Sequence, residues 1–385
     1  MKRNISILGS TGSIGKQALD VVDKCGFNVI ALSANSNVDL LEKQARKYKP
    51  LLVACNNKKS AEDLKIRLKD TSIKVLSGLD GICECAVLDS ADVVLNSVVG
   101  MVGLKPTLCA INSKKEIALA NKETLVAGGE LVMECAKENN VKILPVDSEH
   151  SAIFQSLQGC RERSQIKKLI LTASGGPFFG KTKDQLKNVT VSDALNHPNW
   201  NMGAKITIDS ASMMNKGLEL IEASWLFDMK SEDIDIIVHR QSIVHSLVEY
   251  NDNSVIAQLG VPDMRIPIQY ALTYPDRFES PVKELDLSEV ATLTFDKPDY
   301  ETFVLIDVCK KAISKGGLFP ACVNSANETA NLLFRQGKIK FLDIGDAVSE
   351  ALENAPEVMD YRLEDVDQMN VWADNFVRNY FNLQR

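Results

Sequence analysis

Short apolar runs alternate with amphipathic segments along the first 147 residues of the chain. Segments with a helical spacing of apolar residues, such as 16–24 and 38–48, separate most of these runs. Continuous apolar runs are typical of parallel strands that are buried on both faces. The pattern predicts strands at Ile5–Leu8, Val29–Leu32, Leu51–Ala54, Val93–Leu95, Ile117–Ala120 and Ile143–Val146. We therefore expect residues 1–147 to form a doubly wound, Rossmann-type α/β domain that binds a dinucleotide.

Residues 148–273 show a mixed pattern, which indicates a second, central α/β domain that carries the catalytic residues. The pattern predicts a helix over Ser210–Phe227 and strands at Leu169–Ala173, Ile206–Ile208, Ile234–Val238 and Ser254–Leu259. The segment 175–203 is rich in Gly, Asn and Lys, carries aromatic residues and has no clear period. Long segments of this kind are usually functional lids or unstructured excursions, and we expect a lid.

The last part of the chain has a different pattern. Residues 274–299 include several prolines and little periodicity, which indicates a linker. Beyond it the apolar residues recur with helical spacing, and we expect residues 300–385 to form a C-terminal helical bundle. The predicted helices are Phe303–Ser314, Cys322–Arg335, Ile344–Asn354 and Leu363–Asn382.

Composition and charge exclude several classes of function. The chain of 385 residues has a formal net charge of −7, which argues against nucleic acid or an anionic membrane as a partner, because both need a basic surface. No stretch reaches the roughly 20 apolar residues that a membrane-spanning helix requires. No leader-like segment precedes the first predicted strand, and the nine cysteines are scattered without a zinc-binding spacing. We expect a cytoplasmic protein with reduced thiols.

A glycine-rich turn, Gly9-Ser-Thr-Gly12-Ser-Ile-Gly15, joins the first predicted strand to the first predicted helix. Such a turn brings backbone N–H groups and the positive end of a helix to a pyrophosphate. The alternative is a tight turn without a ligand. The order of strand, turn and helix favours a dinucleotide site.

The end of the second predicted strand indicates which dinucleotide is bound. NAD enzymes usually place an acidic residue there, whereas an NADP site must avoid this charge. The chain has no acid in this stretch before Asp39, which favours NADP. The 2′-phosphate would rely either on the loop residues Asn35, Ser36 and Asn37 or on Lys58 and Lys59 of the next loop.

Two groups of polar residues predict a metal and substrate site. Asp147 and Glu149 follow a strand, and in an extended chain they point to the same side, where Mg²⁺ or Mn²⁺ would relieve their repulsion. On the predicted helix after Asp209, one face carries Ser212, Asn215, Lys216 and Glu219. These residues would complete a metal site and hold a phosphate. The alternative is a solvated polar face in each case.

Two further segments are candidates for function. Asn121, Lys122 and Glu123 follow a strand, and Lys122 would steer a proton at a substrate hydroxyl unless it is an ordinary surface lysine. Trp200 lies in the polar stretch between His197 and Gly203. An aromatic residue there is typical of a lid that closes over a ligand, and the alternative is a ring packed on the surface.

Taken together, these residues resemble the 1-deoxy-D-xylulose 5-phosphate reductoisomerases, enzymes of the non-mevalonate isoprenoid pathway. The resemblance extends over nearly the whole chain and rests on the segments GSTGSIG, LANKETLVAGG, PVDSEHSAIFQSL, ASGGPF, HPNWNMGAKITIDSASMMNKGLE and VPDMRIPIQYAL. It implies NADPH, a divalent metal (Mg²⁺, Mn²⁺ or Co²⁺), a small phosphorylated substrate and a homodimer. The implied reaction isomerises 1-deoxy-D-xylulose 5-phosphate and reduces the product to 2-C-methyl-D-erythritol 4-phosphate.

The resemblance also implies roles for individual residues. It assigns the metal and the catalytic carboxylates to Asp147, Glu149 and Glu219, with Lys122 as a further catalytic residue. It assigns substrate binding to Lys122, Ser148, Glu149, Ser174, His197, Trp200, Met202, Ser210, Asn215, Lys216 and Glu219. It assigns cofactor binding to Thr11, Gly12, Ser13, Ile14, Asn121, Glu123 and Gly203.

The chain departs from the family's pattern at two positions, and two other readings stay open. Ser36 stands where the family commonly has a lysine, and Arg240 stands where it has a proline. One alternative is another NADP-dependent Rossmann-fold dehydrogenase of a small phosphorylated substrate, such as an aldehyde or semialdehyde dehydrogenase with a catalytic cysteine or lysine and no metal. The other is a redox-sensing dinucleotide-binding protein without catalysis.

Overall fold

The computed structural model describes residues 3–200 and 202–383, which divide into two compact units. The first unit comprises the chain up to Thr124 together with Glu130–Ser151 and Asp263–Lys283. The second comprises Leu125–Gly129, Ala152–Pro262 and the chain from Glu284 onward. Asn201, which follows Trp200, lies outside the described residues. None of the helices in the described ranges is long and apolar enough to cross a membrane.

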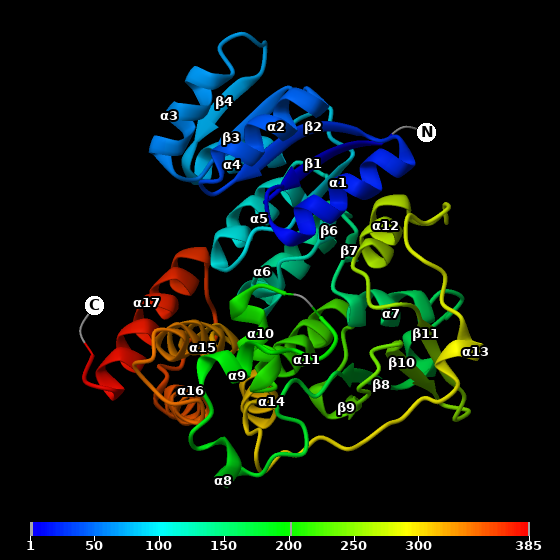
Figure 1. Ribbon diagram of the computed structural model, residues 1–385, viewed down its shortest axis with the longest axis vertical. Helices are drawn as coiled ribbons and strands as arrows, with labels where there is room; N and C mark the ends of the chain where they lie inside the picture. The colour runs from blue at the N-terminus through cyan, green and yellow to red at the C-terminus, as the bar shows by residue number, and fades with distance from the viewer. Residues whose placement is uncertain (1–2, 201, 384–385) are drawn as a thin grey trace. The chain divides into compact units, whose positions relative to one another are not determined.

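The first unit is built on a seven-stranded parallel sheet with the strand order β4-β3-β2-β1-β5-β6-β7 (Figure 1). The order reverses between β1 and β5, which is the position where open α/β sheets bind ligands. The strands are β1 (Asn4–Leu8), β2 (Asn28–Ala34), β3 (Leu52–Cys55), β4 (Lys74–Ser77), β5 (Val93–Asn96), β6 (Glu116–Leu119) and β7 (Ile143–Pro145). The helices are α1 (Ser13–Cys25), α2 (Val38–Tyr48), α3 (Lys58–Arg67), α4 (Gly78–Ala86), α5 (Leu104–Asn112) and most of α6 (Lys122–Asn139), and α7 (Ser148–Ser156) begins in this unit.

Burial explains why the pattern of apolar runs predicts most of these strands. Every residue of β3 and β5 is buried, as expected for strands covered on both faces. The edge strand β4 is different, because its end residues are exposed and its sequence, KVLS, has no apolar run. The sequence analysis missed β4, but the predicted doubly wound domain is confirmed.

The second unit contains a four-stranded sheet with the order β11-β10-β8-β9 and a set of helices. Its strands are β8 (Ile166–Ala173), β9 (Ile234–Val238), β10 (Val244–Tyr250) and β11 (Val255–Leu259). Its helices before the C-terminal region are α8 (Lys183–Leu186), α9 (Val191–Leu195), α10 (Ala204–Ala211), α11 (Met214–Phe227) and α13 (Leu287–Val290). In the C-terminal region, α15 (Phe319–Arg335) packs against α14 (Leu305–Lys315), α16 (Asp343–Asn354) and α17 (Leu363–Tyr380) (Figure 1). The predicted helical bundle is therefore present.

Two predictions for the second unit are wrong. Ile206–Ile208 is helical and lies inside α10, although three β-branched residues in a row favour a strand. The predicted helix Ser210–Phe227 is broken at Met213, whose φ of 61° is left-handed. Ser210 therefore lies in the last turn of α10, which ends at Ala211, and α11 begins at Met214. Tertiary contacts of α10, described below, outweigh the local strand preference.

The contacts of α12 (Arg265–Thr273) place it in the first unit, where it packs against α1, β6 and β7. The sequence analysis put this segment at the end of the central domain. The division into residues 1–147, 148–273, 274–299 and 300–385, with a lid near 175–203, stays a prediction.

Candidate active site

The glycine-rich turn after β1 leads directly into α1. Gly9 has a φ of 85°, and a Cβ there would lie 2.7 Å from the carbonyl oxygen of Ser97, so only glycine fits. Gly12 precedes α1, and no side chain of the described residues caps this helix, whereas Asn37 and Asn57 cap α2 and α3. The first N–H groups of α1 are therefore available to an anion such as a pyrophosphate. The turn contains four of the predicted cofactor residues, Thr11, Gly12, Ser13 and Ile14.

Asn121 and Glu123, also predicted cofactor residues, lie where α6 begins after β6. Asn121 is buried and caps α6, because its Oδ1 accepts a hydrogen bond of 2.8 Å from the backbone N–H of Thr124. Its Nδ2 donates to the carbonyl oxygens of Val98 and Gly100, at 2.7 and 2.9 Å. Asn121 thus holds the end of β6 against the loop that follows β5. This loop lies beside the glycine-rich turn, since β5 pairs with β1.

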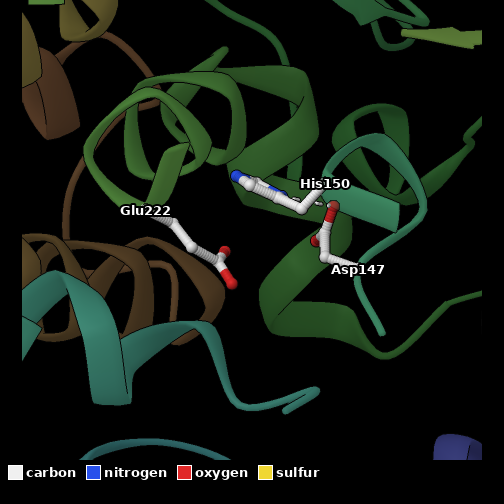
Figure 2. A group of neighbouring side chains, drawn as sticks. All are labelled: Asp147, His150 and Glu222. Carbon is white, nitrogen blue, oxygen red and sulfur yellow. Dashed lines mark hydrogen bonds and ion pairs between the residues drawn. The ribbon is translucent and has the colours of Figure 1, made fainter. Parts of the chain in front are cut away.

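Asp147 lies at the carboxyl end of β7 and is paired with two neighbours. The Nζ of Lys122 lies 2.7 Å from its Oδ2. Nδ1 of His150 lies 3.1 Å from its Oδ1 (Figure 2). Burial by itself raises the pKa of the Asp147 carboxyl, but the Lys122 ammonium and the His150 ring outweigh it and hold this pKa well below its usual value. Asp147 is therefore a carboxylate at neutral pH, which is the form that binds a metal.

Ser148 and Glu149 begin α7, so the predicted extended geometry of Asp147 and Glu149 is wrong. The backbone N–H of Glu149 donates a hydrogen bond of 3.2 Å to Oδ1 of Asp147, which acts like a helix cap. The Ser148 hydroxyl donates to Oε2 of Glu149 at 2.6 Å. The helical turn, rather than strand alternation, is what brings these two carboxylates together.

Glu219 is buried on α11 and contacts two of the predicted phosphate-binding residues. Nδ2 of Asn215 donates to its Oε1 at 2.5 Å, and the Lys216 ammonium pairs with its Oε2. The predicted polar face of one helix is thus correct for these three residues. It is wrong for Ser212, which precedes the break at Met213 and lies outside α11.

His197 and Ser174 are hydrogen-bonded to each other, with Nε2 of the ring 2.9 Å from the Ser174 Oγ. The backbone N–H groups of Asn199 and Trp200 both donate to Nδ1 of His197, at 3.2 and 3.0 Å. Because Nδ1 is the acceptor, the ring proton must be on Nε2, which donates to Ser174. Burial, together with the nearby Arg240, lowers the pKa of His197 and favours this neutral ring. The Ser174 hydroxyl then keeps its own proton for another acceptor.

The predicted lid segment contacts the loop between β9 and β10. The Asn199 side chain donates to the carbonyl oxygen of Arg240 and, at 3.2 Å, to the Ser242 hydroxyl. The Arg240 guanidinium lies 5.0 Å from the ring centroid of Phe179. The half-buried Trp200 ring lies 6.5 Å from that of His245. Met202 is also half-buried, while Gly203 is exposed and precedes α10.

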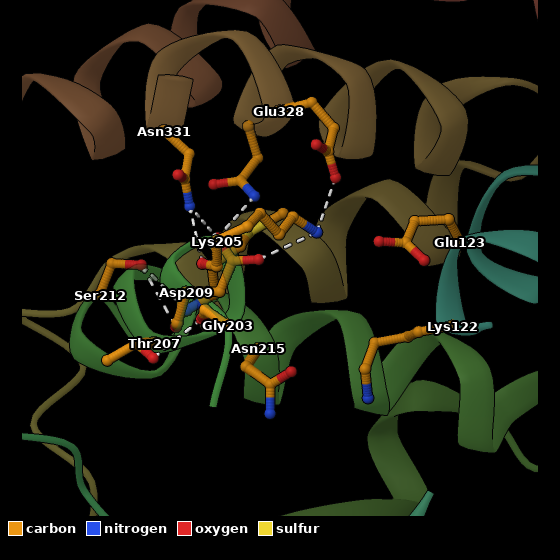
Figure 3. A network of polar contacts seen from close by, with 12 residues as sticks. Lys122, Glu123, Gly203, Lys205, Thr207, Asp209, Ser212, Asn215, Glu328 and Asn331 are labelled. Atoms are coloured by element: carbon orange, nitrogen blue, oxygen red, sulfur yellow. Dashed lines mark hydrogen bonds and ion pairs between the residues drawn. The ribbon is translucent and has the colours of Figure 1, made fainter. Parts of the chain in front are cut away.

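A buried polar network fixes α10, whose last turn carries Ser210, against α15 (Figure 3). Oδ1 of Asp209 accepts hydrogen bonds of 2.9 and 2.8 Å from the side chains of Asn327 and Asn331. Lys205 lies 3.0 Å from Oδ2 of Asp209 and 2.6 Å from Oε1 of Glu328. The sequence analysis gave none of these residues, nor His150, a role. The one available signal was Asp209 itself, a carboxylate directly after the three β-branched residues Ile206–Ile208, because a charged group needs partners if it is buried.

The fold and these groups together define a dinucleotide-dependent oxidoreductase. Two family models described as 1-deoxy-D-xylulose 5-phosphate reductoisomerase and its C-terminal domain match residues 5–129 and 143–227, and one described as the DXP reductoisomerase C-terminal domain matches residues 259–376. The chain belongs to the 1-deoxy-D-xylulose 5-phosphate reductoisomerase family. The resemblance inferred from the sequence motifs is thereby confirmed.

Individual relatives agree with this family over the full length. The 1-deoxy-D-xylulose 5-phosphate reductoisomerases of Ruminiclostridium cellulolyticum and Acetivibrio thermocellus are each 52% identical, covering 98% of this chain and 99% of theirs. The solved structure of the Zymomonas mobilis enzyme with NADPH has a TM-score of 0.93 and 40% identity over 99% of each chain. A DOX-P reductoisomerase in complex with NADPH, fosmidomycin and magnesium has the same TM-score and identity, over 99% of this chain and 98% of that one.

Proposed function

We propose that this chain isomerises 1-deoxy-D-xylulose 5-phosphate and reduces the product with NADPH to 2-C-methyl-D-erythritol 4-phosphate, in the presence of Mg²⁺, Mn²⁺ or Co²⁺. The observation that carries the proposal is family membership over almost the whole chain. The predicted activity, enzyme class and cofactors are those of this family, whose solved members include complexes with NADPH and magnesium. We also propose that the enzyme acts as a homodimer in the cytoplasm.

The proposed metal ligands are Asp147, Glu149 and Glu219. Hard oxygen donors of this kind suit Mg²⁺ and Mn²⁺, and Asp147 is ionised at neutral pH. Hydrogen bonds from Ser148 to Glu149 and from Asn215 to Glu219 hold these two carboxylates, which favours their orientation as ligands. When bound, the cation would supply Lewis-acid polarisation of the substrate carbonyl.

Lys122 and Ser148 are proposed to act at the substrate hydroxyls. The Lys122 ammonium is held by Asp147 at the end of β6, from where it would hold or deliver a proton at a hydroxyl oxygen. Ser148, at the start of α7, would donate or accept one hydrogen bond there. Both residues lie on regular elements, which favours precise positioning.

The substrate phosphate is proposed to bind to Ser174, His197, Ser210, Asn215 and Lys216. Lys216 supplies a positive charge, and the Ser174 hydroxyl keeps a proton to donate because His197 and the Gly176 N–H both donate to its oxygen. Trp200 and Met202 would cover the bound substrate and exclude water. Thr11, Gly12, Ser13, Ile14, Asn121, Glu123 and Gly203 would contact the cofactor, with Asn35, Ser36 and Asn37 near its ribose.

The absorbance of NADPH after addition of 1-deoxy-D-xylulose 5-phosphate tests the proposed reaction. We expect oxidation in the presence of Mn²⁺ and its arrest by excess EDTA. Oxidation that continues in EDTA would contradict the metal requirement and favour a dehydrogenase that uses a cysteine or lysine. No oxidation of NADPH or NADH would contradict the proposed reaction itself.

A further inference from the structure

We propose that Lys58 and Lys59, at the start of α3, supply the positive charge that binds the 2′-phosphate of NADPH. The inference rests on the proposed use of NADPH and assigns the residues that would distinguish it from NADH. It is carried by the geometry at the ends of β2 and β3, two neighbouring parallel strands of the first unit (Figure 1).

The loops that follow β2 and β3 are joined by backbone hydrogen bonds. Ala34 pairs with Cys55 as the last residue of each strand. Beyond this pair, the N–H of Asn56 donates to the carbonyl oxygen of Ala34 at 2.9 Å, and the N–H of Asn57 donates to that of Asn35 at 3.0 Å. The two loops therefore run side by side, and Lys58 is the residue directly after this contact.

The end of β2 is where a Rossmann-type fold places the adenosine ribose. In this chain the loop there offers the polar groups of Asn35, Ser36 and Asn37, all exposed, and no cation. Hydrogen bonds from these side chains alone would leave the charge of a phosphate dianion uncompensated. A cation must therefore come from a neighbouring element.

The two arginines of this edge are already paired with acidic residues. Asp39 lies 2.6 Å from Nη1 of Arg67, and Glu42 lies 2.9 Å from Nε of Arg46. Arg67 also pairs with Asp63 at 2.8 Å. These ion pairs occupy both arginines, so neither arginine is left to pair with a phosphate.

Lys58 and Lys59 directly follow the contact between the two loops. Both are exposed, and within the described ranges neither makes a salt bridge. They occupy the first turn of α3, where the helix dipole also favours an anion. Two unpaired lysines beside a polar loop without a carboxylate fit a phosphate monoester on a ribose.

Binding of 2′,5′-ADP and of AMP, measured by calorimetry without substrate or metal, tests the assignment. The two ligands differ in the 2′-phosphate. We expect the double variant Lys58→Ala, Lys59→Ala to bind 2′,5′-ADP roughly tenfold or more weakly, the effect of losing a charge-assisted hydrogen bond, with AMP binding unchanged. Both side chains are exposed and alanine favours helices, so the variant is expected to fold.

The matched control is the double variant Lys65→Ala, Lys69→Ala, which removes the same charge in the last turn of α3 and just beyond its end. Lys65 lies about 10 Å along the helix from the first turn, because each helical residue adds about 1.5 Å, and Lys69 follows the end of the helix. We expect wild-type affinity in this control. As a rescue, Ser36→Lys in the Lys58→Ala, Lys59→Ala background should restore binding of 2′,5′-ADP by placing a cation in the loop after β2.

Three outcomes would overturn the proposal. The first is an unchanged affinity of the double variant for 2′,5′-ADP, which would leave the proposed function intact. The second is an equal loss in the Lys65→Ala, Lys69→Ala control, which would indicate a general charge effect. The third is a wild-type chain that does not bind 2′,5′-ADP, which would contradict the use of NADPH as well.

Discussion

The Lys122 ammonium lies 2.7 Å from the carboxylate of Asp147, a residue 25 positions later in the chain. The two residues meet because β6 and β7 are parallel neighbours, so the residues that follow them lie at one edge of the sheet. Replacing Lys122 by glutamine should raise the pKa of Asp147 and lower kcat by about a hundredfold or more, the range for loss of a proton-transfer group. Steady-state kinetics and Mn²⁺ affinity between pH 5 and 8 check this. A kcat near that of the wild type would show that the Lys122 ammonium is a structural ion-pair partner of Asp147 and does not take part in proton transfer.

Glu219→Gln keeps the size of the side chain and its contact with Asn215 but removes the negative charge. We expect turnover to fall by more than the roughly 10–100-fold that loss of an outer partner of a metal ligand costs. NADPH binding should be unchanged, because the carboxylate is proposed to serve the metal. Substantial residual activity would contradict the role of Glu219 as a metal ligand.

Trp200→Ala tests the predicted lid. Loss of the ring should raise the KM for the substrate by roughly tenfold, equivalent to about 1.4 kcal/mol of binding, while kcat changes less. Asn199→Ala is a useful companion variant, because it removes the contacts with Arg240 and Ser242 and leaves the ring in place. If the KM of Trp200→Ala equals that of the wild type, the ring packs on the surface and does not cover the substrate.

His245 makes stability depend on pH. Burial lowers its pKa from 6.5 to about 4 in the folded chain, so the unfolded chain binds more protons between these values. Stability should therefore fall as the pH drops from 6.5 to 4, by roughly 3 kcal/mol in all. Chemical denaturation across this range checks the prediction, and His245→Gln should flatten the profile. An NMR titration that gives the His245 ring a pKa near 6.5 in the folded chain would contradict this prediction.

Local pattern is enough to predict the parallel sheet apart from its edge strand β4, because the other strands are apolar runs that only a doubly covered sheet can bury. It also predicts that Asp147 and Lys122 lie at one edge, since both follow strands. It fails for β10, where His245 and Ser246 are buried polar residues inside a strand. It fails again at Ile206–Ile208, because the groups that stabilise α10 come from α15, more than a hundred residues away.

The residue roles at the site are only partly predictable for a similar reason. A hydrogen bond such as that between His197 and Ser174 depends on where the lid backbone turns, and no spacing in the sequence encodes this. The buried Asp209 could have been singled out as a polar residue in need of partners. Its partners, Asn327 and Asn331, are separated by one helical turn of α15, which becomes meaningful only once the two helices are known to pack.

The left-handed backbone of Met213 divides the proposed substrate-binding residues of this segment between two helices, α10 and α11. Ser210 is carried by α10, which is bound to α15 through Asp209, whereas Lys216 and Glu219 are carried by α11, which packs against α14. In the C-terminal region α10 thus packs on α15, whereas α11 packs mainly on α14. Substitutions in α14 or α15, remote in sequence from every proposed ligand, are therefore expected to change the position of Ser210 relative to Lys216 and Glu219.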